Sequence, residues 1–378
     1  MRVMFYAPLK PPTHPVPSGD RRIARLLMRA IEAAGHSVEL ATRFRSRDGS
    51  GDEARQIKMA ALGKRVADRL IRQIKSRPAE ERPQVWFTYH LYYKAPDYIG
   101  PAVCAEFGIP YVVAEASHAA KQEDGPWAVG HRAAEAGIRA ADRIILLNSA
   151  DLEGLEGIVA DSAAIVRQTP FIDTARFAEA ALASSRHRTE VAHELGLDAG
   201  KPWLISVAMM RHGDKLQSYR ALSAAVSKLT DLDWSLIIVG DGATRPVVEA
   251  AFNEAAPGRT VFVGRREGND LGRLLAASDI YVWPAINEAF GMAFLEAQAS
   301  GLPVVAGGYG GVSDVVTGGG IITPPDDVDA FAAAVRLLIS DAARRDSLAA
   351  AAQRSVTDIS LASRTIDRLL KDVVGEEA

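Results

Sequence analysis

The chain alternates between short runs of apolar residues and longer stretches in which apolar residues recur every three or four positions. The first apolar run, 2–7, is followed after a proline-rich stretch by helical spacing over 20–34. Gly35 then stands where a helix C-cap is expected, and 38–40 resumes as a strand. A strand, a helix and a strand in this order predict a parallel sheet.

The same alternation continues through the first 150 residues. It predicts strands at 85–88, 111–114 and 143–147 and helices at 96–107 and 129–140. Residues 48–82 are predicted to be mostly one basic amphipathic helix. The pattern weakens over 174–200, and a second alternating series begins at residue 201. Its predicted strands are 203–208, 234–239, 260–263, 279–283 and 303–306, with helices between them.

These patterns predict an α/β protein with two doubly wound, Rossmann-like domains that face a cleft. The predicted parts are an N-terminal domain (1–173), a linker region (174–200), a C-terminal domain (201–355) and a C-terminal helical segment (356–378) that packs back toward the first domain. Ligands of open parallel sheets bind at the carboxyl ends of the strands. The chemistry is therefore expected in the loops that follow the strands.

Composition narrows the class of protein. Hydrophobic residues make up 48% and charged residues 24%, the balance of an ordinary globular protein. Apolar runs fall far short of the ~20 residues that span a bilayer, and the first run is too short for a signal peptide. A single cysteine, Cys104, cannot form an internal disulfide. These features predict a cytoplasmic protein.

Charge is unevenly divided along the chain. The formal net charge of −3 argues against a dedicated nucleic-acid binder. Residues 1–110 hold 19 Lys and Arg against 11 Asp and Glu, whereas the remainder holds 25 against 36. Eight basic residues lie between Arg55 and Arg77 on the predicted amphipathic helix. Such a helix suits peripheral contact with the anionic inner face of a membrane, and a solvated face packed on the first domain is an equally open interpretation.

The most informative segment is 283–305. Glu288 is expected in the loop after a strand, immediately before a helix, where the N–H groups of 290–294 and the helix dipole favour an anion. Glu296, eight residues further on, can face the same cleft. Each glutamate alone fits an ordinary helix-start acid, but the flanking Gly291 and the segment 301–305 favour a binding site.

The run E-A-F-G-M-A-F-L-E-A-Q-A-S-G-L-P-V-V resembles the hallmark of family 4 retaining glycosyltransferases, which have the GT-B fold. Other segments match in the expected order: a hinge-like 171–177, the strand ends 239–242 and 262–264, and the loops 310–316 and 318–325. The likeness covers essentially the whole second domain and is looser over the first.

The resemblance implies a function. A sugar would pass from a nucleoside diphosphate sugar to a glycan, lipid or small-molecule acceptor, with retention of anomeric configuration and with no metal or other cofactor. By position, the family pattern places Arg211, Lys215 and Gly19 at the donor diphosphate, and Glu296 at the ribose. It makes Glu288 and His118 catalytic, Phe290, Gly291 and Met292 the contacts to the donor sugar and backbone, and Gly264 and Arg265 the strand end on the base side. Leu216 replaces the glycine that usually follows the lysine.

Several alternatives bear on this interpretation. His90, after the strand that begins at 85, is a second candidate histidine. The Asp-x-Asp triplets 231–233 and 327–329 read as a pre-strand turn and a helix N-cap, so no metal ligand is assigned. A nicotinamide-dependent oxidoreductase is disfavoured because the nearest fingerprint, 240–245, has arginine for its third glycine. A sugar-nucleotide-binding protein or epimerase of the same fold, without transfer to an acceptor, stays open.

Overall fold

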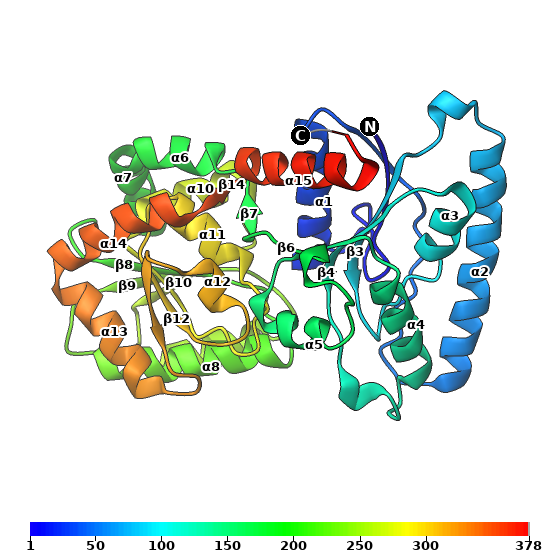
Figure 1. The fold of residues 1–378 in the computed structure, drawn as a ribbon. Helices are drawn as coiled ribbons and strands as arrows, with labels where there is room; N and C mark the ends of the chain where they lie inside the picture. Colours follow the sequence, from blue (N-terminus) through cyan, green and yellow to red (C-terminus); the bar gives the residue numbers. More distant parts are fainter. Residues whose placement is uncertain (377–378) are drawn as a thin grey trace. The chain divides into compact units, whose positions relative to one another are not determined.

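The computed structural model describes residues 1–376 and contains two compact units (Figure 1). Unit 1 takes Met1–Thr169 and the chain from Ile359 onward, and unit 2 takes Pro170–Asp358. The chain therefore passes between the units twice.

Unit 1 is built on six parallel strands in the order β2-β1-β3-β4-β5-β6. The strands are β1 (Arg2–Tyr6), β2 (Ser37–Leu40), β3 (Val85–Leu91), β4 (Tyr111–Ala116), β5 (Arg143–Leu146) and β6 (Ile165–Arg167). The helices are α1 (Gly19–Ala33), α2 (Glu53–Lys75), α3 (Gly100–Phe107), α4 (Ala128–Arg139), α5 (Leu152–Glu156) and α15 (Ile359–Val374). α1 packs on α15, while α2 packs on α3 and α4.

Unit 2 also contains six parallel strands, but their order differs from that of unit 1: it is β10-β9-β8-β11-β12-β13. The strands are β8 (Trp203–Val207), β9 (Ser235–Val239), β10 (Thr260–Gly264), β11 (Ile280–Trp283), β12 (Val304–Gly307) and β13 (Gly320–Thr323), and β7 (Phe171–Ile172) pairs separately with β14 (Thr357–Asp358). The helices are α6 (Ala175–Leu182), α7 (Ser184–Leu195), α8 (Asp214–Val226), α9 (Arg245–Ala255), α10 (Gly268–Ala277), α11 (Met292–Ala299), α12 (Val312–Val315), α13 (Val328–Ser340) and α14 (Ala342–Ser355).

The helices of unit 2 form two groups. α10 packs on α6, α7 and α11, and α11 packs on α14, whereas α8 packs on α9 and α13. Figure 1 shows α8 and α13 on the opposite face of the sheet from α6, α10 and α14. Helices on both faces bury the central strands of the sheet, which is why a strand such as β9 is a continuous apolar run, 236–239, rather than an alternating one.

A buried carboxylate organises the centre of unit 1. Asp97, 3% exposed, accepts hydrogen bonds from the Thr88 hydroxyl at 2.6 Å and the Tyr111 hydroxyl at 3.0 Å. Its other oxygen accepts from the backbone N–H groups of Ile99 at 2.7 Å and Gly100 at 2.8 Å. Burial raises the pKa of Asp97, and these four donors act in the opposite direction. The carboxylate joins β3, β4 and the start of α3.

The predicted fold class is confirmed: both units are doubly wound, with parallel sheets. Two predicted segments differ in detail from the structure. The expected linker, 174–200, contains helices α6 and α7. Their buried apolar residues are only Phe177 and Val191, so the apolar periodicity of this segment is weak. The helix expected over 96–107 begins only at Gly100, because the Asp97 side chain accepts a hydrogen bond from the Gly100 N–H and so precedes the helix start.

Within the two six-stranded sheets, the short strands β6 and β13 are absent from the sequence-based prediction. β13 begins in a run of three glycines, which carries no apolar signal. Gly320 is required there, because a Cβ would lie 2.4 Å from the carbonyl oxygen of Val304 on the neighbouring strand. In the described part of the chain no helix is both long and apolar enough to cross a membrane.

Candidate functional site

The loops at the carboxyl ends of β8, β9 and β10 are bound to one another. The Met210 N–H donates to Asp241 at 2.9 Å, and the Gly240 N–H donates to Gly264 at 2.9 Å. A Cβ on Gly240 would lie 1.9 Å from the carbonyl oxygen of Ala208, so only glycine permits this approach. The backbone hydrogen bonds therefore fix the edge of the sheet where parallel sheets bind ligands.

The segment that joins β11 to α11 is held by α8. The Ile286 N–H donates to Ser218 Oγ at 3.0 Å, and the Asn287 side chain donates to Asp214 Oδ1 at 3.1 Å. Ala285 and Asn287 have φ angles of 60° and 50°. This left-handed backbone costs a non-glycine residue on the order of 1–3 kcal/mol, and such strain collects at functional sites.

Lys215 and Glu288 meet at the centre of this edge. Lys215 Nζ forms an ion pair with Glu288 Oε2, and the ammonium lies 5.4 Å from the ring centre of Trp283. The two side chains are 15% and 19% exposed. A partly buried pair of this kind is screened by salt much less than a surface pair. The structure thus brings Lys215, which the family pattern places at the donor diphosphate, into contact with Glu288, which the same pattern makes catalytic.

Gly291 caps the N-terminus of α11 with a left-handed φ of 71°. A Cβ there would lie 2.4 Å from the Phe294 ring and 3.3 Å from Glu288 Cγ, so the close packing around Glu288 depends on the absence of a side chain. One expectation needs correction. The Phe294 N–H donates to the Gly291 carbonyl at 2.8 Å, so it is committed to the helix cap and is not open to an anion.

Glu296 lies in the second turn of α11 and is 3% exposed. Its Oε1 lies 3.6 Å from Arg176 Nη2. Arg176 belongs to α6, and its guanidinium stacks on the Phe177 ring at 4.6 Å. A buried carboxylate requires such compensation, because removing a lone charge from water is costly. Arg176 is therefore part of the site, although it falls at the start of the segment predicted as linker.

The remaining unit 2 candidates lie around the same edge. Arg211 is exposed on the loop between β8 and α8. Gly264 ends β10 with a left-handed φ of 71°, and the next residue, Arg265, pairs with Glu267 at 2.5 Å. Phe290 is buried immediately before the cap, and Met292 opens α11.

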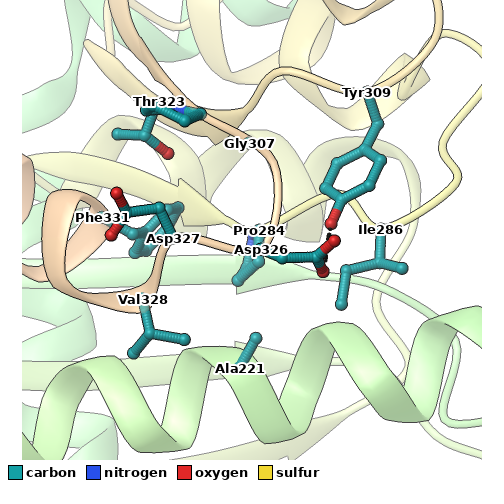
Figure 2. Close-up of a pocket in the computed structure, with 11 residues that line it drawn as sticks. Ala221, Pro284, Ile286, Gly307, Tyr309, Thr323, Asp326, Asp327, Val328 and Phe331 are labelled. Atoms are coloured by element: carbon teal, nitrogen blue, oxygen red, sulfur yellow. Dashed lines mark hydrogen bonds between the residues drawn. The ribbon is translucent and has the colours of Figure 1, made fainter.

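A small pocket lies behind the β11–α11 segment, and Figure 2 shows its lining. Ile286 and Pro284 form one side, with Phe331 among the apolar residues opposite, and the Tyr309 hydroxyl donates to Asp326 Oδ1 at 2.5 Å. None of the residues that the sequence analysis assigned to the donor lines this pocket. Its lining is mostly apolar.

In unit 1, Gly19 opens α1 after the N-cap Ser18, and the neighbouring Asp20 faces His90. His90 Nδ1 lies 3.3 Å from Asp20 Oδ1 and 3.7 Å from Glu115 Oε1. Burial by itself lowers the pKa of His90, but the charges of Glu115 and Asp20 outweigh it and raise the pKa to about 9. His90 is thus held as an imidazolium between two carboxylates.

His118 follows β4 and turns toward α4. Its Nε2 lies 3.6 Å from Glu135 Oε2, and His131 Nε2 lies 3.6 Å from the same oxygen. The other Glu135 oxygen accepts two hydrogen bonds from Arg139, which lower the pKa of Glu135. Burial lowers the pKa of His131. A Cβ on Gly154 would lie 2.7 Å from the His118 carbonyl, so α5 fixes the backbone of His118 from the other side.

The two Asp-x-Asp triplets take the places that the sequence predicts. Asp327 caps α13 and accepts from the Ala330 N–H at 2.8 Å. Asp231 precedes β9 and pairs with Arg336 at 2.6 Å.

Sequence reasoning missed the residues that support the site. Asp214 and Ser218 carry an i, i+4 signal on α8 that could have shown a shared face. His131 and Glu135 carry the same spacing on α4. Arg176 lies in the hinge-like segment 171–177, but nothing in that segment indicates a contact with Glu296, because only packing brings α6 to α11.

Comparison with known protein families gives a match over the larger part of unit 2. Residues 201–341 match the family model described as glycosyl transferases group 1. Residues 201–341 belong to the group 1 glycosyl transferases. The segment contains both glutamates and Lys215, so the resemblance expected from the sequence is confirmed at the level of the family.

Curated relatives agree with this assignment. The chain is 30% identical over 310 residues to the D-inositol 3-phosphate glycosyltransferase of Salinispora tropica, which covers 76% of this chain and 63% of the relative. It is 32% identical over 182 residues to a GDP-mannose-dependent α-mannosyltransferase of Mycobacterium tuberculosis, covering 47% of this chain and 42% of the relative. The match thus spans less than two thirds of either relative's length.

Solved structures resemble the fold over nearly the whole chain. HepE from Anabaena, crystallised with UDP, superimposes with a TM-score of 0.73 at 16% identity, covering 98% of this chain and all of that one. A glycosyltransferase from Rickettsia africae gives a TM-score of 0.71 at 14% identity, with 99% of each chain covered. Residues 201–341 are therefore part of a chain with the GT-B fold.

Proposed function

We propose that the chain is a retaining glycosyltransferase that uses a nucleoside diphosphate sugar as donor and a glycan, lipid or small molecule as acceptor. The observation that carries the proposal is the Lys215–Glu288 pair, partly buried at the carboxyl edge of the unit 2 sheet beside the glycine-capped α11. Membership of the group 1 glycosyl transferases supports it, as do relatives whose names describe glycosyl and mannosyl transfer.

In the proposed reaction the bond between the anomeric carbon and the diphosphate oxygen breaks, and the acceptor oxygen forms the new bond on the same face. The acceptor proton passes to the departing phosphate, so no protein nucleophile is needed. Lys215 and Arg211 stabilise the negative charge that builds on the leaving group, and Glu288 lies at the reacting end of the donor. By the family pattern, His118 contacts the donor sugar.

Labelled nucleotide release tests the function directly. A transferase releases nucleoside diphosphate from its donor at a rate that rises when a suitable acceptor is added. An epimerase of the same fold converts the sugar nucleotide with no acceptor present, and that result would reject transfer. A thermal-shift panel of UDP-, GDP- and ADP-sugars identifies the donor first, because a ligand that binds only the folded state raises the unfolding midpoint.

Glu296 is expected to act through the ribose, so Glu296→Ala should weaken free nucleotide and sugar nucleotide alike. Loss of a hydrogen bond to a charged group costs roughly 1.5–3 kcal/mol, or about 10- to 150-fold in affinity. Calorimetry with the bare nucleoside diphosphate measures this. Glu254→Gln, on the exposed side of α9, is the control and should bind normally. Normal binding by Glu296→Ala would remove Glu296 from the ribose.

Transfer is expected to survive excess chelator. Arg211, Lys215 and the N-terminus of α11 supply positive charge for the diphosphate, which is the role of a divalent ion in metal-dependent transferases. Initial rates with and without EDTA measure the effect. A strict requirement for added Mg²⁺ or Mn²⁺ would contradict the role given to these residues.

Helix α2 is the proposed site of peripheral membrane contact. Its outer side exposes Ile57 and Leu62 together with basic residues such as Lys58 and Arg65. Each cation near an anionic surface contributes on the order of 1 kcal/mol. Co-sedimentation with liposomes should therefore increase with anionic lipid content and decrease with salt. Co-sedimentation that is indifferent to both would reject the contact.

A further inference from the structure

The side chains of His118, His131 and Glu135 converge in unit 1. Each histidine offers one imidazole nitrogen and Glu135 offers one carboxylate oxygen, and these three atoms lie within 4.8 Å of one another. His131 and Glu135 are four residues apart on α4 and so share one face of the helix. His118 comes from the segment after β4, and its ring centre lies 4.9 Å from that of His131.

Hydrogen bonding does not account for this arrangement. Both histidine–carboxylate distances are 3.6 Å, beyond the range of an N–H···O hydrogen bond. Within the described residues, the buried Nε2 of His118 has no hydrogen-bond partner. A buried polar atom without a partner is costly and calls for an explanation.

The distances suit a shared metal ion. Zinc binds imidazole nitrogen and carboxylate oxygen at about 2.0–2.2 Å, and two tetrahedral ligands at that distance lie roughly 3.4 Å apart. The two histidine–carboxylate separations of 3.6 Å are close to this value, and the three ligand atoms together lie within 4.8 Å of one another. The second Glu135 oxygen is held by Arg139 at 2.8 Å, which orients the carboxylate as outer-shell partners do in metal sites.

We propose that His118, His131 and Glu135 form a binding site for a divalent transition-metal ion such as Zn²⁺. Two imidazoles and one carboxylate favour zinc over magnesium, which prefers oxygen ligands. Three protein ligands leave one position open for water. Glu135, whose side chain is 29% exposed, gives the ion a path from solvent, whereas His131 is buried.

The site would make the protein sensitive to zinc. Binding of the ion does not depend on the proposed function, but the effect of the ion on activity rests on that function. A metal ion bound to His118 Nε2 would remove His118 from its predicted contact with the donor sugar. Added Zn²⁺ should then inhibit transfer, and EDTA should reverse the inhibition. This agrees with activity that needs no metal.

Calorimetry with Zn²⁺ alone tests the site on the full chain. One Zn²⁺ should bind per chain, and Mg²⁺ at the same concentration should not bind. His131→Ala and Glu135→Gln should each weaken Zn²⁺ binding about tenfold or more. His193→Ala removes an exposed histidine from α7 and should leave the affinity unchanged. Zn²⁺ should also raise the unfolding midpoint of the wild-type protein and of His193→Ala only.

Glu135→Gln keeps the size of the side chain, so it tests the site even if replacement of the buried His131 prevents folding. Circular dichroism checks the fold of both variants. Absence of Zn²⁺ binding, or equal affinity in the wild type and Glu135→Gln, would overturn the site. Tight binding without inhibition of transfer would leave the metal site in place and reject the role of His118 in transfer, so the two proposals fail separately.

Discussion

Replacement of Glu288 by glutamine is expected to lower the turnover number by about 100-fold or more, with free nucleotide binding almost unchanged. Glutamine keeps the size of the side chain but removes the charge that pairs with Lys215. An interaction that is strongest in the transition state appears in turnover rather than in ground-state affinity. Initial rates with the full donor, together with calorimetry on the bare nucleoside diphosphate, separate the two effects.

The matched control for this experiment is Glu254→Gln, an exposed position in the same unit with the same chemical change. It should turn over like the wild type. If Glu288→Gln also turns over like the wild type, Glu288 is only a helix-start acid and the proposed site is wrong. If Glu288→Gln loses nucleotide affinity instead of turnover, Glu288 belongs to the nucleotide end of the donor.

Asp97→Ala is expected to lower the free energy of unfolding of unit 1 by roughly 3–5 kcal/mol, because four buried donors lose their common acceptor at once. The hydroxyls of Thr88 and Tyr111 and two backbone N–H groups would be left in a dry core. Urea unfolding followed by circular dichroism measures the change. Asp124→Ala, at an exposed position of the same unit, should stay within about 0.5 kcal/mol of the wild type.

A destabilisation of Asp97→Ala no larger than that of Asp124→Ala would mean that water replaces the carboxylate without cost. Asp97→Asn adds a second measurement. Its amide presents one oxygen and two N–H groups, so it cannot accept from donors on both sides and should also be destabilising. Asp97 stands far from any recognised motif, and nothing in its local sequence indicates that four groups converge on it.

Most of the architecture could be predicted from the chain because it depends on local periodicity. Buried parallel strands are unbroken apolar runs, and the apolar residues of amphipathic helices recur every three or four positions, so five of the six strands in each large sheet can be predicted from the sequence. Prediction failed where that signal is thin. α6 and α7 bury few apolar side chains, and β13 begins among glycines.

Part of the candidate site also depends on local sequence and could be predicted. The eight-residue spacing of Glu288 and Glu296, the glycine at the start of α11 and the N-cap Asp327 are local features, and the sequence alone located them. Local rules work there because the backbone conformation of a loop or helix end is set by residues three or four positions apart.

Only the tertiary structure decided which side chains meet. Lys215 and Glu288 are separated by 73 residues and pair because β8 and β11 are neighbours in the sheet. Arg176 reaches Glu296 through the packing of α6 on α11, and His118 reaches Glu135 only because the segment after β4 turns toward α4. Such contacts depend on strand order and helix packing. These bring together residues that are far apart in the sequence, and the local sequence around each residue does not indicate its partner.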